Sequence, residues 1–171
     1  MNPSNADGFR KQLLASRRAA GSREPSHVNE IDLRTRATIH FSSEDPAHPV
    51  EHMLDGSSGT GATRWISARR DVPEEILLEF DEPQHVSHIA FEVEERQATR
   101  TQEIRAEFST DGGRNYRQAF IQEYTFSPDG ANYECENLSV DLRAITHLRF
   151  IIVPNKGGSG AASLTSLRLF S

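Results

Sequence analysis

Met53-Leu54-Asp55-Gly56 is followed, after a short polar stretch, by Thr63-Arg64-Trp65, which holds the only tryptophan of the chain. An Asp-Gly pair is a strong turn signal, because Asp bonds its own backbone and Gly accepts positive φ. A second such signal, Ser109-Thr110-Asp111-Gly112-Gly113, ends a stretch of alternating apolar residues. These turns, with a single Trp where a strand would start, indicate a β-protein that displays loops.

Short segments with apolar residues at every second position surround these turns, which is the period of a half-buried strand. The expected strands cover 37–41, 75–80, 88–93, 103–108, 116–126, 138–142, 148–153 and 163–170. Polar turn sequences separate them, including Asp81-Glu82-Pro83 and Ser127-Pro128-Asp129-Gly130. No helical stretch of convincing length lies between them. The pattern predicts an all-β fold, an antiparallel β-sandwich of jelly-roll type.

The length of 171 residues suits one domain with a tail. We assign 31–171 to the sandwich and 1–30 to a mobile basic tail, which is poor in large apolar residues. A short helix starting at Asp7 would place Phe9 and Leu13 on one face, and docking against the domain or a partner is the alternative.

Charge and cysteine content restrict the function classes. Residues 1–36 carry seven basic and four acidic side chains, whereas the remainder carries twelve basic and twenty-one acidic ones. An acidic domain repels phosphate backbones, so nucleic-acid binding is disfavoured. Cys135 is the only cysteine, which favours a reducing compartment. No apolar stretch is long enough for a signal peptide or a membrane span, so we expect a cytoplasmic protein that does not bind membranes.

The quoted residues resemble a known family. Val50-Glu51-His52-Met53-Leu54-Asp55-Gly56 with Thr63-Arg64-Trp65 is similar to the signature of discoidin, or coagulation factor 5/8 type C, domains of the galactose-binding-like superfamily. The 103–116 stretch resembles the central hairpin of that family, and 163–169 resembles its last strand. The resemblance covers roughly 37–171. It implies a non-catalytic module that binds ligands through loops at one end of the sandwich, often with a structural calcium ion.

The resemblance implies a calcium site made by Asp55, Thr63 and the backbone carbonyl of Leu54. Calcium requires several converging oxygen ligands. The acidic residue that the family places after Asp-Gly is replaced by Ser57-Ser58, and the one in the last strand by Ser166. The alternative is that Asp55 caps its own turn through an Asx hydrogen bond. We therefore treat calcium as a weak expectation and name no other cofactor.

Two further residues each allow two interpretations. Trp65 is either a platform that stacks against a sugar or the core tryptophan of the family. Arg96 occupies the position where sugar-binding relatives place an arginine that donates hydrogen bonds to ligand hydroxyls. The alternative interpretation is that Arg96 is solvated and paired with Glu94 or Glu95.

Further cations are predicted near Arg96 at the ligand-binding end. Arg69 and Arg70 follow Trp65, Arg100 follows Arg96, and Lys156 lies in a glycine-rich loop. We expect the loops 43–49, 66–72, 95–101 and 154–161 to form this end. The resulting positive patch would suit a carboxylate, sulfate, phosphate or acidic protein loop, with ordinary surface charge as the alternative.

Enzymatic and zinc functions find little support. His48 and His52 are four residues apart, but Pro49 opposes a helix between them. No serine occupies a nucleophile elbow, and Gly157-Gly158-Ser159-Gly160 lacks the Lys of a phosphate loop.

The sequence therefore predicts a non-catalytic binding module whose most favoured ligand is a carbohydrate. An intracellular protein–protein adaptor is the main alternative, and a domain that recognises DNA breaks is a less favoured one. The oligomeric state is left open.

Overall fold

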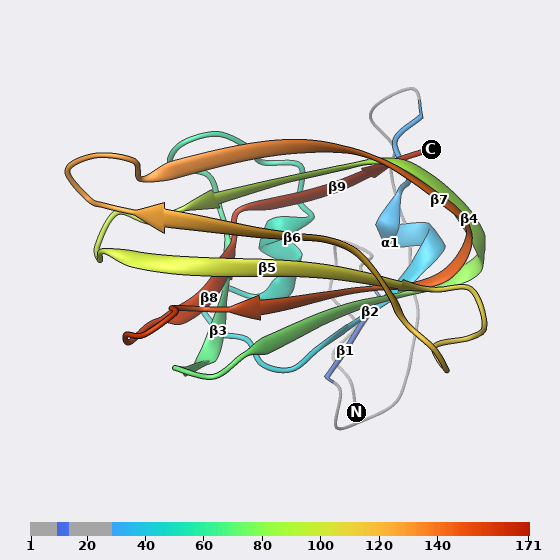
Figure 1. The fold of residues 1–171 in the computed structure, drawn as a ribbon, viewed down its shortest axis with the longest axis horizontal. Coiled ribbons are helices and arrows are strands. Elements are labelled where there is room, and N and C mark those ends of the chain that lie inside the picture. The colour runs from blue at the N-terminus through green and yellow to red at the C-terminus, as the bar shows by residue number, and fades with distance from the viewer. Residues whose placement is uncertain (1–9, 14–28) are drawn as a thin grey trace.

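A computed structural model describes residues 10–13 and 29–171, and Figure 1 shows them as layered β-strands. The elements are β1 (Lys11–Leu13), α1 (Leu33–Arg36), β2 (Ala37–Phe41), the 3₁₀ helix η1 (Val50–Met53), β3 (Trp65–Arg70), β4 (Glu74–Glu94), β5 (Arg100–Ser109), β6 (Arg117–Phe126), β7 (Tyr133–Val153), β8 (Ala161–Leu164) and β9 (Ser166–Phe170). Among these residues, no helix is long and apolar enough to cross a membrane.

Two long strands, β4 and β7, take part in both layers of the sandwich. The first part of β4 pairs with β2 and with the end of β7, in a layer ordered β1-β2-β4-β7-β5-β6. The second part of β4 pairs with the start of β7 and with β9. Strands β3 and β8 form a separate antiparallel pair. The antiparallel β-sandwich is confirmed, and β1 with β2 is the parallel exception.

The continuity of β4 and β7 corrects the predicted strand boundaries. Segments 75–80 and 88–93 belong to one strand, so Asp81-Glu82-Pro83 does not reverse the chain. The register of β4 against β7 shifts between Glu79 and His88, and Ala144 of β7 has φ 52°. Such irregularities bend and twist a strand, which lets it leave one layer and enter the other. Figure 1 shows both strands curving together at one end of the molecule.

The core lies between the layers and follows the predicted alternation. Ile89, Phe91 and Val93 of β4 are all buried. Across the core, the Phe91 ring stacks on Phe120 of β6, with centroids 5.9 Å apart. Such aromatic contacts contribute beyond the apolar area that they bury.

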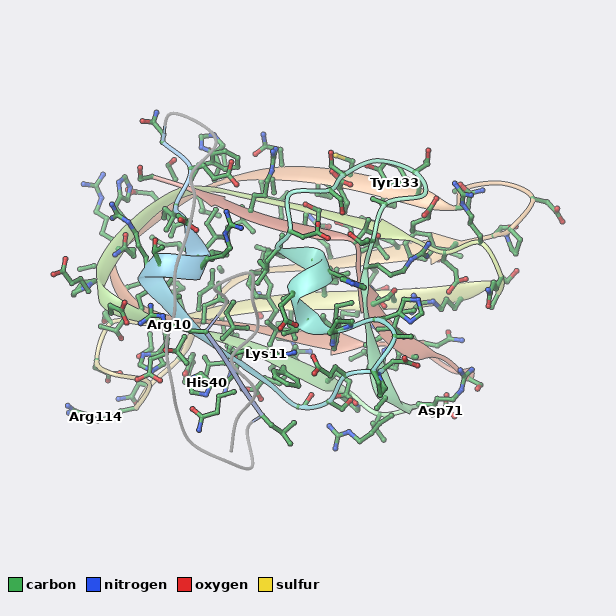
Figure 2. The ribbon with its side chains drawn as sticks, turned by 180° about the vertical axis from the view of Figure 1, so that it is seen from behind. Arg10, Lys11, His40, Asp71, Arg114 and Tyr133 are labelled. Atoms are coloured by element: carbon green, nitrogen blue, oxygen red, sulfur yellow. The ribbon has the colours of Figure 1, made fainter. Side chains whose placement is uncertain are left out.

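The described part of the N-terminal segment is a strand. Ile39 donates its backbone N–H to the Arg10 carbonyl at 2.7 Å, and Arg10 forms a two-pronged contact with Asp81 at 2.5 and 2.8 Å. Lys11 reaches Glu51 of η1 at 2.6 Å (Figure 2). The short helix that the sequence allowed in this tail does not form over Lys11–Leu13, because the acidic groups beside β2 and its open edge hold this segment extended. Residues 1–9 and 14–28 of the predicted tail lie outside the described residues.

Candidate functional site

A cavity of about 390 Å³ opens at the end of the sandwich where β4 ends and β5 begins. This is the left-hand end in Figure 1, away from the bend of β4 and β7. Its walls come from His48 before η1, from β3 and the residue preceding it, from the 94–100 segment and from the 159–163 segment. All four loops predicted to form the ligand end thus contribute to one cavity.

Strand β3 separates the core from the cavity. Trp65 is fully buried, and its indole N–H donates to the Ser43 carbonyl at 3.1 Å. Successive side chains along an extended chain point to opposite sides, so the neighbours Arg64 and Ile66 line the cavity. The interpretation of Trp65 as a core residue is confirmed.

The Glu94 carboxylate, whose side chain is 0% exposed, connects two arginines at the cavity wall. It accepts hydrogen bonds from Arg64 Nη2 at 3.1 Å and from Arg96 Nε at 2.6 Å. The Gly61 N–H also donates to both of its oxygens, and Arg64 additionally bonds the Glu94 carbonyl. A buried carboxylate needs such partners. The arrangement fixes the inner edge of the Arg96 guanidinium, while the side chain remains 54% exposed.

Arg100 joins the strands below the cavity. Only 4% of this residue is exposed, and its guanidinium donates to the side chains of Glu95, Gln102 and Ser163 and to the Pro154 carbonyl, all at 2.7–2.8 Å. Burial lowers the Arg100 pKa from its ordinary value, although the Glu95 carboxylate opposes this effect. Arg100 is thus mainly a structural link between β5, the end of β7 and β8.

The Glu95 carboxylate is likewise held by hydrogen bonds within the protein. Its carboxylate accepts hydrogen bonds from the backbone N–H groups of Gln97 and Ala98 and from Arg100. Burial acts to raise the Glu95 pKa, but these bonds outweigh burial and leave the pKa below its ordinary value. The carboxylate therefore stays ionised and shapes the 95–98 turn.

The 154–161 loop is fastened to β3 and β5. Asp71, which has φ 62° and is labelled in Figure 2, accepts a hydrogen bond from the Gly160 N–H at 2.6 Å. The Asp71 N–H donates back to the Gly160 carbonyl. On the other side, Asn155 accepts a hydrogen bond from the Thr101 N–H. These contacts hold the cavity rim in position.

The structure brings together three of the five predicted contact residues, because Arg70, Arg96 and Arg100 line the cavity. Arg69 does not line it, since its guanidinium donates to the buried Glu74 carboxylate at 2.8 and 2.9 Å. Lys156 also lies outside, because it pairs with Glu103 of β5 and Glu123 of β6. The partners of Lys156 lie 53 and 33 positions away in the sequence, beyond a local pattern, whereas the Arg69–Glu74 pair spans only five positions.

Sequence reasoning did not single out His48 or Arg64 as lining residues. The signal for Arg64 was available, because a residue beside an inward-pointing Trp on a strand faces the other way. No local signal identifies His48, whose buried Nδ1 has no hydrogen-bond partner among the described residues.

The predicted calcium ligands form a closed hydrogen-bonded turn. Asp55 accepts from the Ser57 N–H at 2.8 Å and from the Thr63 hydroxyl at 2.6 Å, and Ser57 also contacts Thr63. Burial acts to raise the Asp55 pKa, but these hydrogen bonds outweigh it and lower the pKa.

This turn matches the Asx interpretation of Asp55. Calcium takes six to eight oxygen ligands, whereas this turn offers one carboxylate with both oxygens engaged. Among the described residues, no group of three or more His, Cys, Asp or Glu side chains converges. The side chains of this turn therefore do not fit a calcium site.

The model of the F5/8 type C domain family matches residues 38–167 of this sequence. The chain belongs to the F5/8 type C domain family. The match spans most of the sandwich, including the strands and the loops that build the cavity. No curated protein matches this F5/8 type C domain.

Solved structures share the fold. A module from Clostridium perfringens in complex with GalNAc-β-1,3-galactose is 19% identical, with a TM-score of 0.58 and coverage of 83% of this chain and 99% of that one. The family 32 module of NanJ from C. perfringens, in complex with galactose, is 16% identical, with a TM-score of 0.57 and coverage of 84% and 98%. The corresponding module of AlyQ, in complex with 4,5-unsaturated mannuronic acid, is 16% identical, with a TM-score of 0.60 and coverage of 84% and 98%.

Proposed function

We propose that this F5/8 type C domain is a non-catalytic module that binds a carbohydrate in the cavity between β3, the 94–100 segment and the 159–163 segment. The observation that carries the proposal is the Arg96 guanidinium, which buried Glu94 holds by one edge at the cavity wall. Its remaining nitrogens are donors suited to sugar hydroxyls. The bound sugars of the solved relatives support the same ligand class.

The cavity chemistry favours binding over catalysis. Glycoside hydrolysis uses two carboxyl groups that are free to exchange protons or attack the sugar. The two carboxylates here, Glu94 and Glu95, are held by guanidinium and backbone N–H groups. The apolar part of the wall consists of Ile66 and alanines, with no Phe, Tyr or Trp among the described lining residues. We therefore expect hydrogen bonding, rather than stacking, to supply the affinity.

A glycan array followed by calorimetric titration with the best ligand tests this function. We expect Arg96→Ala to weaken binding at least tenfold, because it removes the positioned donors. Arg143→Ala is the matched control, since Arg143 is 75% exposed and pairs with Asp141 outside the cavity. The proposal fails if no saccharide binds at millimolar concentration or if Arg96→Ala binds as the unaltered protein does.

A further inference from the structure

The cavity concentrates positive charge on an acidic protein. Its lining residues include four guanidiniums but only two carboxylates, which leaves a formal excess of two positive charges. The whole chain has a formal net charge of −6. A concave site of opposite sign to the rest of the surface attracts ligands of complementary charge.

The two carboxylates of the cavity form ion pairs with three of the four guanidiniums. Glu94 pairs with Arg64 and Arg96, and Glu95 pairs with Arg100. Arg70 has no carboxylate partner within ion-pair distance among the described residues. Among the described residues, the Arg70 guanidinium makes one hydrogen bond, a long one of 3.5 Å to the Ser159 hydroxyl.

The backbone around Arg70 explains why it stays unpaired. The adjacent acid, Asp71, turns away and accepts the Gly160 N–H. Arg70 itself is opposite Ala161 in the β3–β8 pair, so its backbone is fixed at the rim. Arg70 also lies close enough to Arg100 for their like charges to repel, which adds to the effect of burial in lowering the Arg100 pKa. An anion beside Arg70 would relieve this repulsion.

We propose that the cavity selects an acidic saccharide, with Arg70 pairing with the carboxylate of a uronic acid unit while Arg96 bonds neutral hydroxyls of the same ligand. The proposal rests on the carbohydrate-binding function above and specifies its ligand class. The flat guanidinium fork matches a carboxylate with two parallel hydrogen bonds. A sulfate ester shares the charge, and the experiment separates the two.

Calorimetric titration compares digalacturonate and dimannuronate with their methyl esters, which keep the ring and hydroxyls but lose the charge. We expect at least one acid to bind about tenfold more tightly than its ester, as a charge-assisted hydrogen-bonded pair does. Added salt should weaken binding of the acid and leave the ester unaffected. Arg70→Gln should bring the acid down to the affinity of the ester, whereas Arg143→Gln should retain the preference.

Each outcome has a distinct meaning. Equal affinity for acid and ester overturns the acidic-ligand proposal but leaves carbohydrate binding intact. A preference that survives Arg70→Gln overturns the role of Arg70. Tighter binding of a sulfated galactose disaccharide than of either uronate overturns the choice of carboxylate. Failure of every saccharide, charged or neutral, rejects the proposed function itself. An unchanged melting temperature shows that Arg70→Gln is folded, as its single long contact predicts.

Discussion

Replacing Glu94 by Gln tests whether the buried carboxylate positions the cavity arginines. The substitution keeps the size of the side chain but removes the charge that Arg64 and Arg96 share. Breaking a buried ion pair costs about 3–5 kcal/mol. Here both cations are partly exposed, at 24% and 54% of their side chains, so we expect a smaller loss of about 2 kcal/mol.

The expected consequences can be measured separately. For a protein of this size, about 2 kcal/mol corresponds to a fall in melting temperature of roughly 4–8 °C. Arg96 would also lose its fixed orientation, and ordering one long side chain on binding costs about 0.5–1.5 kcal/mol. Saccharide affinity should therefore fall by up to about tenfold in the variant at a temperature where it is fully folded.

Glu103→Gln is the matched control for Glu94→Gln. Glu103 is also buried and also pairs with two cations, Arg105 and Lys156, but it does not line the cavity. We expect the control to melt at a lower temperature and to bind saccharide with unchanged affinity. If Glu94→Gln binds as tightly as the unaltered protein, or if both variants lose affinity equally, the positioning role of Glu94 is refuted.

Four further predictions follow from the described contacts. Arg100→Met leaves several buried acceptors without a donor, so urea unfolding should show a loss of about 3–5 kcal/mol, and a loss below about 1 kcal/mol would contradict the linking role of Arg100. Millimolar calcium should leave the melting temperature unchanged, because Asp55 already uses both oxygens; a marked rise would show that the turn opens to bind the ion. Hydrogen bonds, first of all from Asn115, lower the Asp111 pKa. The ionised Asp111 carboxylate therefore stabilises the fold above the unfolded pKa of about 4, and this stabilisation is lost as the pH falls. Asp111→Asn should consequently show a shallower acid-induced decrease in melting temperature than the unaltered protein. Lys11→Glu places like charges beside β2, so the Ile39 amide, which bonds the Arg10 carbonyl, should exchange hydrogen faster; unchanged exchange would mean that the ion pairs do not hold β1.

Sequence reasoning identified the layers because period-two alternation depends only on nearby residues. Ile89, Phe91 and Val93 alternate in the sequence and are buried together in the core. The core position of Trp65 also followed from its place at the start of a strand. The convergence of four loops on one cavity could be expected because strands of a sandwich end at shared edges.

The strand boundaries could not be predicted because turn residues do not distinguish a reversal from a bend. Asp81-Glu82-Pro83 carries the composition of a turn, yet the chain continues through it from one layer into the other. Only the pairing of β4 with β7 on both sides decides between the two outcomes. That pairing joins residues between 39 and 78 positions apart, from Glu94 with Tyr133 to Glu74 with Ile152, beyond the reach of a local pattern.

The ion-pair partner of Arg69 was hidden for a different reason, because Glu74 is only five positions away but its burial depends on the tertiary fold. Arg69 and Arg70 are adjacent and chemically alike, but they lie on opposite faces of an extended strand. Arg69 forms a hydrogen-bonded ion pair with Glu74, whereas Arg70 lies at the cavity rim. Predicting which one is free requires knowing where Glu74 is buried, and this depends on its bonds to Ser42 and Ser43.

The buried and the exposed residues of the cavity differ in role, which explains why membership of the family does not determine the ligand. Glu94 and Arg100 are buried and bonded to the scaffold, so their geometry belongs to the sandwich. Arg70 and the outer edge of Arg96 lie at the rim and make few contacts with the protein. We expect substitutions at such rim positions to change the ligand without disturbing the fold, because a fold does not determine a function and relatives at 16–19% identity share the fold alone. We therefore propose that ligand choice in this domain depends on the charge and donors of two rim arginines, which the comparison of acid and ester ligands measures directly.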